Sequence, residues 1–331
     1  MGFFGKRSPT EEPRRLFFAT DLHGSSQAWR KMLHAPRVYD VQALICGGDV
    51  AGKRLYPIVD VGAGRYLTTV DHRQVEVEGD TAVKDVKKRL EAEGGYYVVL
   101  RPDEAEALEQ DPPAMERKFA EQVRNRLAEW VEIAEERLAG TEVSCYITGG
   151  NDDEEEMLAP LFADRFEHVV PSEGRVVEVL GHPMISLGWS NETPWHTPRE
   201  TTEEHLAELI DDSASLLDSY ENAIFNLHVP PKDSTLDTCA KLDTSQDPPA
   251  PVMIGGEVAQ FGAGSSAVAA AIRKYQPLLS LHGHIHESTA VNTIGRTTCI
   301  NPGSEYQNGT LLGAIVALRT NKVMNYQLTL G

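Results

Sequence analysis

Residues 16–24 read LFFATDLHG, an apolar run that ends in two polar side chains, Asp21 and His23. The apolar residues predict a buried strand, and the glycine behind them allows the backbone to turn. The segment SSQAWRKMLH (25–34) then predicts a helix whose N-cap is one of its two serines. Strand, polar turn and helix in this order are the repeating unit of α/β proteins.

The same pattern recurs along the chain. VQALICGGDV (41–50) carries Asp49 behind two glycines. VSCYITGGNDDEEEM (143–157) carries Asn151, and its acidic residues favour the first turn of a helix. Further strands are expected at 175–180, 184–188, 222–228, 278–282, 297–301, 311–318 and 323–329. Strands and helices therefore interleave, and the expected fold class is α/β.

Residues 53–140 interrupt this rhythm with their own strands and a long amphipathic segment at 113–139. We interpret them as a cap-like insertion, serving as a lid or as a surface for homo-oligomerisation, within a single domain spanning 15–331. Residues 1–14 are expected to form a flexible tail. The Pro- and Gly-rich stretch 229–265 predicts a long irregular loop, a kind of segment that is usually functional or mobile.

The composition restricts the ligands. A net charge of −19 provides no broad cationic surface for long nucleic acid or an anionic membrane. No apolar stretch reaches the roughly 20 residues that span a bilayer. The segment MGFFGKRSPTEEPRR (1–15) lacks the apolar core of a signal peptide, and a cytoplasmic protein is expected. Cys46, Cys145 and Cys299 lie in apolar runs and are expected to be buried free thiols. A phosphate-bearing ligand would then depend on local positive charge, which bound metal ions supply.

Unusual polar residues directly follow five apolar runs. They are Asp21, His23, Asp49, Asn151, His228, His284 and His286. Open α/β sheets place their ligand sites at the carboxyl ends of strands, so these side chains are expected to converge. Mixed carboxylate, imidazole and amide donors suit Mn, Fe, Zn or Co. Two such ions, roughly 3.5–4 Å apart, can share one carboxylate and a water molecule.

The ordered set D-x-H, G-D, G-N, H and G-H-x-H resembles the signature of the calcineurin-like metallophosphoesterase superfamily. NLHVPP (226–231), HGHIHES (282–288) and INPGS (300–304) look like its Icc-related branch. The resemblance implies a two-sheet β sandwich flanked by helices, with α/β/β/α layers and an insertion after the second motif.

The resemblance also implies a dinuclear centre; of the four metals that suit these donors, manganese is the one expected. One ion would be held by Asp21, His23, Asp49 and His286, and the other by Asn151, His228 and His284, with Asp49 bridging. A metal-bridging hydroxide would then attack phosphorus in line. Asn151 and His228 are further expected to contact the substrate.

One residue departs from the family pattern. The family commonly has histidine after the asparagine, whereas this chain has Asp152. Without the imidazole, protonation of the leaving group is weakened by about 10²- to 10⁴-fold unless another group replaces it. Asp152 is therefore assigned to the catalytic group with Asp49, Asn151 and His228; alternatively, it is only the N-terminal residue of the helix expected there.

The expected function is metal-dependent hydrolysis of phosphate esters, with a diester of a small or nucleotide-type molecule as the favoured substrate. A phosphomonoesterase, including a phosphoprotein phosphatase, and a non-catalytic metal-binding scaffold are the alternatives. His282 is interpreted as a buried hydrogen-bonded residue. Trp189, Trp195 and Tyr306 are interpreted as packing residues rather than as stacking partners of a base.

Overall fold

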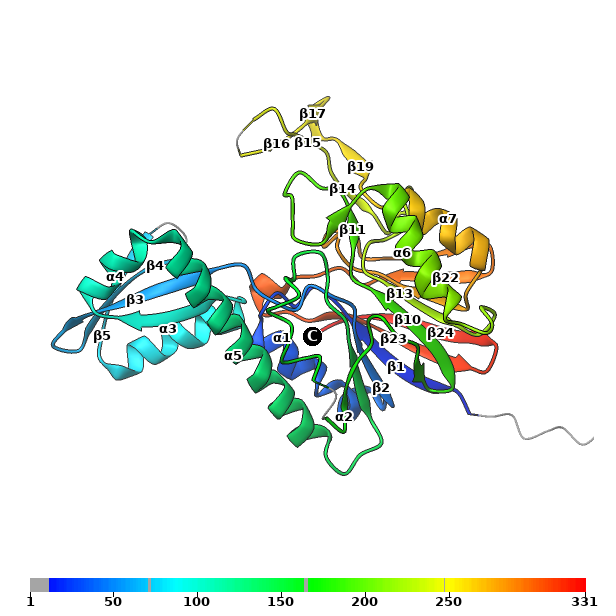
Figure 1. Cartoon of the computed structure of the whole chain (residues 1–331), viewed down its shortest axis with the longest axis horizontal. Helices are drawn as coiled ribbons and strands as arrows, with labels where there is room; N and C mark the ends of the chain where they lie inside the picture. The colour runs from blue at the N-terminus through cyan, green and yellow to red at the C-terminus, as the bar shows by residue number, and fades with distance from the viewer. Residues whose placement is uncertain (1–11, 71–72, 164–165, 247) are drawn as a thin grey trace, which may run out of the picture.

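Two six-stranded sheets form the body of the protein in the computed structural model (Figure 1). The structure describes residues 12–70, 73–163, 166–246 and 248–331. The first sheet has the order β24 (Lys322–Leu330), β23 (Leu312–Arg319), β1 (Arg14–Ala19), β2 (Ala43–Cys46), β7 (Ser144–Ile147), β8 (Val169–Pro171). The second has the order β21 (Ala290–Ile294), β22 (Thr297–Asn301), β20 (Leu279–Leu281), β13 (Ile224–Leu227), β10 (His182–Leu187), β9 (Val177–Val179). The predicted mixed α/β class is confirmed, and most of the tail expected at 1–14 lies outside the described residues.

The central strands of both sheets run parallel. β1 pairs with β2, and β2 with β7, in parallel register. In the second sheet β13 pairs in parallel with β10 and β20. Only strands toward the edges, such as β23 and β21, pair antiparallel with their neighbours. The carboxyl ends of the central strands therefore lie along one edge of each sheet.

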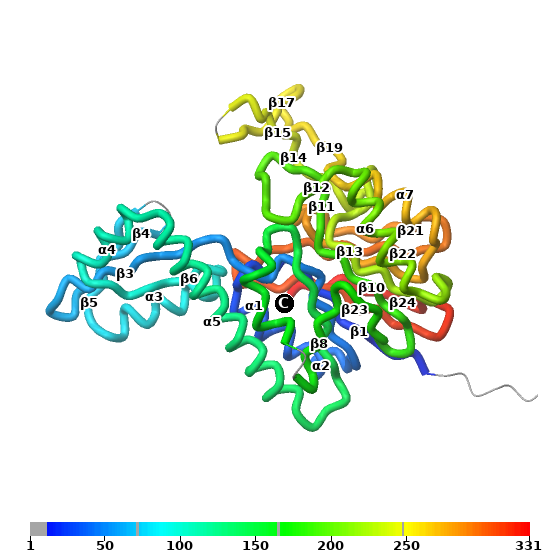
Figure 2. The backbone as a smooth tube through the Cα atoms, viewed as in Figure 1, coloured from blue at the N-terminus to red at the C-terminus, as the bar shows by residue number. Residues whose placement is uncertain are grey.

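A third sheet stands to one side of the body (Figure 2). Its order is β5 (Arg73–Glu78), β4 (Arg65–Val70), β3 (Leu55–Gly62), β6 (Tyr96–Leu100), and it is accompanied by α3 (Asp80–Ala92) and α4 (Pro102–Glu109). It has a small core of its own, centred on Ile58, Val70, Val83 and Leu90. The amphipathic segment expected at 113–139 is α5 (Pro112–Leu138), which returns the chain to the body.

The segment expected to be an irregular loop at 229–265 is instead largely a paired arm. Its short strands are β14 (Thr238–Ala240), β15 (Leu242–Asp243), β16 (Ala250–Pro251), β17 (Met253–Ile254), β18 (Glu257–Val258) and β19 (Gln260–Gly262). They pair antiparallel, β14 with β19, β15 with β16 and β17 with β18. The arm projects from the body above β11 (Ser190–Asn191), which pairs with β12 (Glu200–Thr201). Strands of two or three residues leave almost no periodic signal in a sequence.

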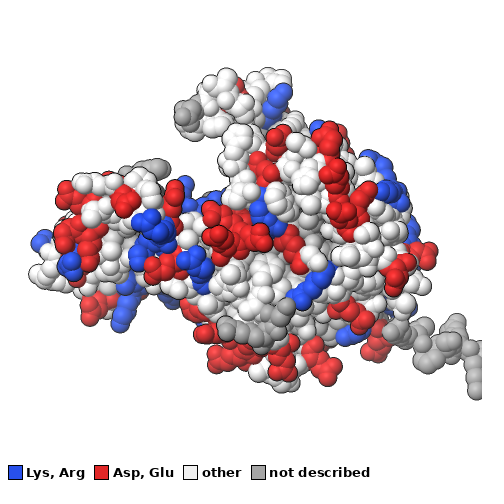
Figure 3. All heavy atoms as spheres, in the orientation of Figure 1, with Lys and Arg blue, Asp and Glu red and all other residues white. Residues whose placement is uncertain are grey.

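Acidic side chains are spread over the face seen in Figure 3, with Lys and Arg between them rather than gathered into one cationic surface. This distribution agrees with the net charge of −19. Within the described parts of the chain, no helix combines the length and the apolar character needed to cross a bilayer.

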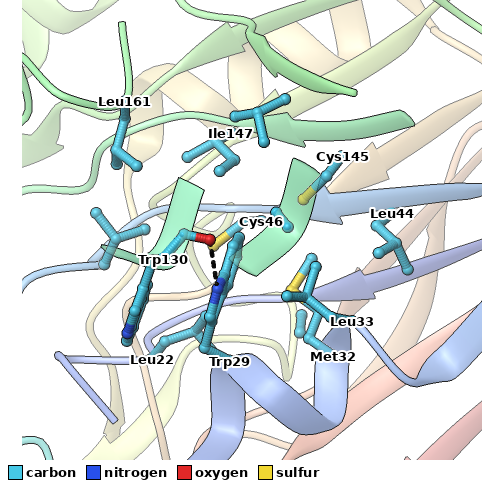
Figure 4. Close-up of a cluster of buried hydrophobic side chains, with 14 of the residues drawn as sticks. Leu22, Trp29, Met32, Leu33, Leu44, Cys46, Trp130, Cys145, Ile147 and Leu161 are labelled. Atoms are coloured by element: carbon cyan, nitrogen blue, oxygen red, sulfur yellow. Dashed lines mark hydrogen bonds between the residues drawn. The ribbon is translucent and has the colours of Figure 1, made fainter. Parts of the chain in front are cut away.

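Three clusters of buried side chains lie on the faces of the two large sheets. One contains residues of both sheets, among them Phe18, Ile45, Leu281 and Ile300. A second lies between the first sheet and the helices α1 (Ser26–Met32) and α5, where Trp29 and Trp130 stack (Figure 4). The third joins the second sheet to α6 (Glu203–Ser215) and α7 (Ser266–Tyr275). Cys46, Cys145 and Cys299 are buried free thiols, as predicted.

Candidate metal centre

All seven side chains singled out in the sequence lie together at the carboxyl ends of parallel strands. Asp21 and His23 follow β1, Asp49 follows β2, and Asn151 follows β7. His228 follows β13, and the pair His284 and His286 follows β20. The first sheet therefore supplies both carboxylates and the amide, and the second supplies three of the four imidazoles. Side chains from two sheets meet because both sheets end on the same side of the body.

One subgroup consists of Asp21, His23, Asp49 and His286, whose ligand atoms all lie within 4.8 Å of one another. His23 Nε2 is 3.1 Å from His286 Nε2 and 3.6 Å from Asp49 Oδ2. His286 Nε2 is 3.3 Å from Asp21 Oδ1. Nitrogen and oxygen donors at these separations can surround one cation, and the donor types fit a borderline divalent ion.

A second subgroup surrounds the side-chain oxygen of Asn151. His228 Nε2 is 3.0 Å from Asn151 Oδ1, and His284 Nδ1 is 2.7 Å from the same atom. His228 Nε2 also lies 3.5 Å from Asp49 Oδ1. Asp49 therefore faces His23 through one carboxylate oxygen and His228 through the other. Asp49 is thus placed between the two subgroups, with one carboxylate oxygen near a histidine of each.

The backbone that carries these side chains is strained. Asp21, His23, Asp49 and His284 have φ angles of 54°, 41°, 48° and 66°. Non-glycine residues rarely adopt this left-handed region, and such conformations concentrate at functional sites. The neighbouring backbone is also tightly packed, since a Cβ on Gly150 would lie 2.1 Å from Asp49 Oδ1. The strained turns thus bring the side chains of these four residues together. A residue larger than glycine at position 150 would clash with Asp49.

Burial and the two carboxylates set the charges of the histidines. Burial lowers the pKa of His23 to about 3 and that of His284 to about 4, so both imidazoles are neutral and have a free lone pair. Burial disfavours charge on His228 as well, but the Asp49 carboxylate raises its pKa to about 10. The pKa of Asp49 is held well below its usual range, chiefly by His228 acting against burial. The centre therefore contains anionic oxygens and at least two unprotonated nitrogens, as a metal site requires.

Asp152 does not begin a helix, because residues 151–162 contain only turns, bends and irregular backbone. Its carboxylate forms an ion pair with Lys53, and its backbone N–H donates to Asp49 Oδ1 at 3.0 Å. Burial and the nearby Asp49 raise the pKa of Asp152 to about 6, although Lys53 opposes this rise. The interpretation of Asp152 as a helix N-terminal residue is therefore wrong. Lys53, which the motifs did not indicate, is its actual partner.

The adjacent Asp153 explains why turns replace the predicted helix. Its fully buried carboxylate accepts hydrogen bonds from the backbone N–H groups of Val50, Ala51 and Gly150. It thereby ties the loop of Asp49 to the loop of Asn151. Burial raises the pKa of Asp153 to about 7 despite these three donors. A helix starting at this point would withdraw the side chain from its partners.

Several other residues support the centre. Thr197 accepts a hydrogen bond from Asn151 Nδ2 at 2.9 Å, and Ser304 Oγ donates to the backbone oxygen of Asp21 at 2.7 Å. The amide of Asn301 donates to the carbonyls of Gly283 and Ile285 and so braces the loop of His284 and His286.

His282 is buried with Nδ1 2.8 Å from the Leu227 oxygen, as predicted. The Tyr306 ring packs against His23, with centroids 4.6 Å apart.

The chain is similar over part of its length to one curated protein. No model of a known protein family matches the chain. The uncharacterised protein MJ1162 of Methanocaldococcus jannaschii is 26% identical over 155 residues, which cover 46% of this chain and 61% of that protein. The match therefore spans less than two thirds of that relative.

Among solved structures, TT1561 of Thermus thermophilus is 13% identical, with 96% of this chain and 98% of that chain covered and a TM-score of 0.52. This likeness shows a similar fold alone. A dimetal phosphatase from Danio rerio is 9% identical over 96% of this chain and 99% of that chain, with a TM-score of 0.39. In this chain, the group of Asp and His side chains itself indicates that a divalent metal binds there.

Proposed function

We propose that this protein is a metal-dependent hydrolase of phosphate esters with a calcineurin-like fold, and that its substrate is a small phosphodiester of the nucleotide type. The observation that carries the proposal is the position of Asp49. Its two carboxylate oxygens face imidazoles of the two subgroups at 3.6 and 3.5 Å. The core cluster shared by the two large sheets supports the sandwich arrangement.

The donor set fits two divalent cations. Asp21, His23, Asp49 and His286 would hold one, and Asn151, His228 and His284 would hold the other with Asp49 shared. When bound, such ions activate water as a nucleophile and neutralise charge on the phosphate. Mn, Fe, Zn and Co all suit these donors, and we favour Mn.

The protein's own groups provide the remaining polar environment. Lys53 lies at the wall of the cavity that opens on the centre, beside Asp49 and Asp152. A lysine ammonium group has three donors, so Lys53 can contact a phosphate oxygen while it stays paired with Asp152. Asn151 and His228, which touch each other at 3.0 Å, are the other groups that we assign to substrate contact.

The preference for a diester rests on Asp152. A monoester carries nearly two negative charges, and the Asp152 carboxylate at the cavity wall repels the second charge. A diester carries one charge. The expected activity is therefore higher on bis-p-nitrophenyl phosphate than on p-nitrophenyl phosphate. The opposite order would favour a phosphomonoesterase, including one acting on phosphoproteins.

Activity of the metal-loaded protein tests the proposal. Purified chain is stripped of metal, reloaded with Mn, Fe, Zn or Co, and assayed on bis-p-nitrophenyl phosphate. Asp49→Asn should abolish turnover, because it weakens both cation sites. Its circular dichroism spectrum should match that of the wild type, which would show that the fold is retained. Asp212→Asn, an exposed position on α6, is the matched control and should keep full activity.

The rival proposal is a non-catalytic scaffold whose metal site serves only structure. It predicts that the wild-type protein binds metal but hydrolyses neither ester with any of the four ions. Turnover that Asp49→Asn leaves unchanged would also overturn the assignment of Asp49.

We further propose that residues 53–140 are a cap-like insertion in a single domain that begins at residue 15. The insertion starts directly after the loop of Asp49 and packs on the loop of His23. Arg126 of α5 donates to the backbone oxygens of Gly24 and Gly95, at 3.1 and 2.8 Å. This arrangement supports a cap role near the centre; a homo-oligomer formed through the insertion is an alternative that sedimentation analysis would detect.

A further inference from the structure

The cavity beside the metal centre is much larger than a phosphate group. It encloses about 560 Å³, and its lining includes Asp49, Asn151, His284 and His286 at one end. Pockets of roughly 300–1,000 Å³ are typical of sites for small organic ligands. Most of this volume is therefore available to the group that carries the phosphate.

The other walls come from two separate segments. One is the loop between β11 and β12, including residues 191–195 and Thr197. The other is the root of the arm, where Cys239 and Phe261 are opposite one another in the β14–β19 pair. Opposite residues of an antiparallel pair point to the same face, so both side chains face the cavity. The arm thus forms one side of a ligand-sized space.

Two aromatic side chains on these walls are unusually exposed. Trp195 is 55% exposed and Phe261 is 44% exposed, and both line the cavity. Neither ring stacks on another ring among the described residues. By contrast, Trp189 packs against the core of the second sheet. The interpretation of Trp195 as a packing residue is therefore wrong, and its ring is free to stack on a ligand.

Besides Lys53, which is paired with Asp152, two further lysines line the same cavity. In the described part of the chain, Lys232 and Lys241 make no ion pair, although the protein has 50 acidic residues and 31 basic ones. Glu203, on the same wall, is already engaged, because it accepts hydrogen bonds from Ser265 and Ala267. Glu192 and Glu287 are exposed and can accept hydrogen bonds from hydroxyl or amino groups. Lys232 and Lys241 provide uncompensated positive charge some way from the cation site.

From these features we infer that the outer part of the cavity binds the leaving group of the substrate, and that this group is a nucleoside phosphate. Its base would stack on Trp195 and Phe261, and its own phosphate would lie near Lys232 and Lys241. The inference rests on the proposed function and deepens it, since it makes the substrate a dinucleotide-sized diester with a second phosphate.

Binding of adenosine 5′-monophosphate to the Mn-loaded protein tests the stacking without depending on turnover. Trp29 and Trp130 are buried and Trp189 is half-buried, so Trp195 is the most accessible indole, and its quenching by the nucleotide reports binding in the wild type and in Phe261→Ala. Trp195→Ala, which lacks this fluorophore and is measured by calorimetry, and Phe261→Ala should each weaken binding about 10-fold, the usual scale of one base–aromatic stack. Trp195→Phe, followed by calorimetry, should retain most of the affinity. Ile254→Ala is the matched control, because Ile254 is 68% exposed on the same arm but does not line the cavity.

Turnover of the dinucleotide pApA tests the rest of the inference. Wild type should prefer pApA over an analogue whose leaving nucleotide lacks its base, and Trp195→Ala should remove that preference. Lys232→Met and Lys241→Met should raise KM for pApA more than for ApA, which lacks the terminal phosphate, whereas Lys322→Met on β24 should not.

Aromatic variants that bind the nucleotide as the Ile254→Ala control does would overturn the inference, as would lysine variants that do not distinguish pApA from ApA. If the wild-type protein hydrolyses no phosphate ester but still binds the nucleotide through Trp195, the proposed function fails and the subsite stands. If the wild-type protein hydrolyses bis-p-nitrophenyl phosphate but does not bind the nucleotide, the proposed function stands and the subsite fails.

Discussion

Lys53 forms an ion pair with Asp152. Asp152 directly follows Asn151, where calcineurin-like metallophosphoesterases commonly have a histidine. The pair lies beside Asp49, since the Asp152 N–H donates to Asp49 Oδ1 at 3.0 Å. An anionic and a cationic side chain therefore lie together at the edge of the candidate metal centre. On the proposed function, this pair affects both the charge presented to the phosphate and the supply of a proton to the leaving group.

Replacing Asp152 with histidine should shift activity toward monoesters. The change removes a carboxylate that repels a doubly charged phosphate and adds a possible proton donor, worth about 10²- to 10⁴-fold where it is well positioned. The ratio of turnover on p-nitrophenyl phosphate to that on the bis ester is the measurement. Glu154→His, an exposed position two residues on, is the control. An unchanged ratio in Asp152→His would show that the lack of a histidine at this position does not limit activity on monoesters.

Metal binding should release protons at neutral pH. Without a cation, Asp49 raises the pKa of His228 to about 10 against the effect of burial, so this imidazole is protonated. It must lose that proton to bind metal, and apparent affinity should therefore rise with pH up to that value. Calorimetric titration with Mn in buffers of different ionisation enthalpy counts the protons. His228→Asn should release about one fewer, and equal heats in all buffers would contradict this assignment.

Glu203 should contribute stability that depends on pH. Burial tends to raise its pKa, but hydrogen bonds from Ser265, Ala267 and Ser266 outweigh burial and lower it below the usual value of 4.5. Their contribution is therefore fully present above pH 4.5 and is lost as pH falls through the lowered pKa.

Glu203→Gln should reduce the free energy of unfolding by about 1 kcal/mol at pH 7, the usual scale for a helix cap, and by less near pH 3. Urea denaturation at both pH values measures the difference. Glu204→Gln, the next residue in the same helical turn, should have little effect. A loss that is equal at both pH values would show that the charge of Glu203 is not the cause.

Arg126 should couple the insertion to the metal centre. Its guanidinium is buried, and it donates to the Gly24 and Gly95 carbonyls. Arg126→Met leaves both acceptors unpaired and should cost about 2–3 kcal/mol of stability. Metal affinity should fall as well, because Gly24 follows His23. Arg117→Met, exposed on the same helix, serves as the control. Unchanged affinity in Arg126→Met would disprove the coupling.

The sequence was sufficient to predict the convergence of the seven polar side chains. Each of them follows an apolar strand within a few residues, and parallel strands end on one side of a sheet, so local pattern and topology agree. A serine N-cap for the first helix, which is Ser25 of the two serines considered, and the long helix near 113–139 were predicted for the same reason, because their signals lie within the segments themselves.

Features that depend on distant partners were missed. The acidic run after Asn151 favours a helix locally, but Asp153 accepts hydrogen bonds from two backbone N–H groups of the Asp49 loop and from one in its own turn, and these bonds compete with a helix. Lys53 and Asp152 are about 100 positions apart, and no motif joins them. The exposure of Trp195 depends on an arm whose strands are too short to leave a pattern.

Anomalous diffraction from crystals of the Mn-loaded protein locates the bound cations. Two peaks are expected, one among Asp21, His23, Asp49 and His286, and one among Asn151, His228 and His284, with Asp49 within bonding distance of both. A Mn-loaded crystal with no peak at these side chains, or with a single peak that Asp49 does not touch, would rule out a dinuclear centre bridged by Asp49.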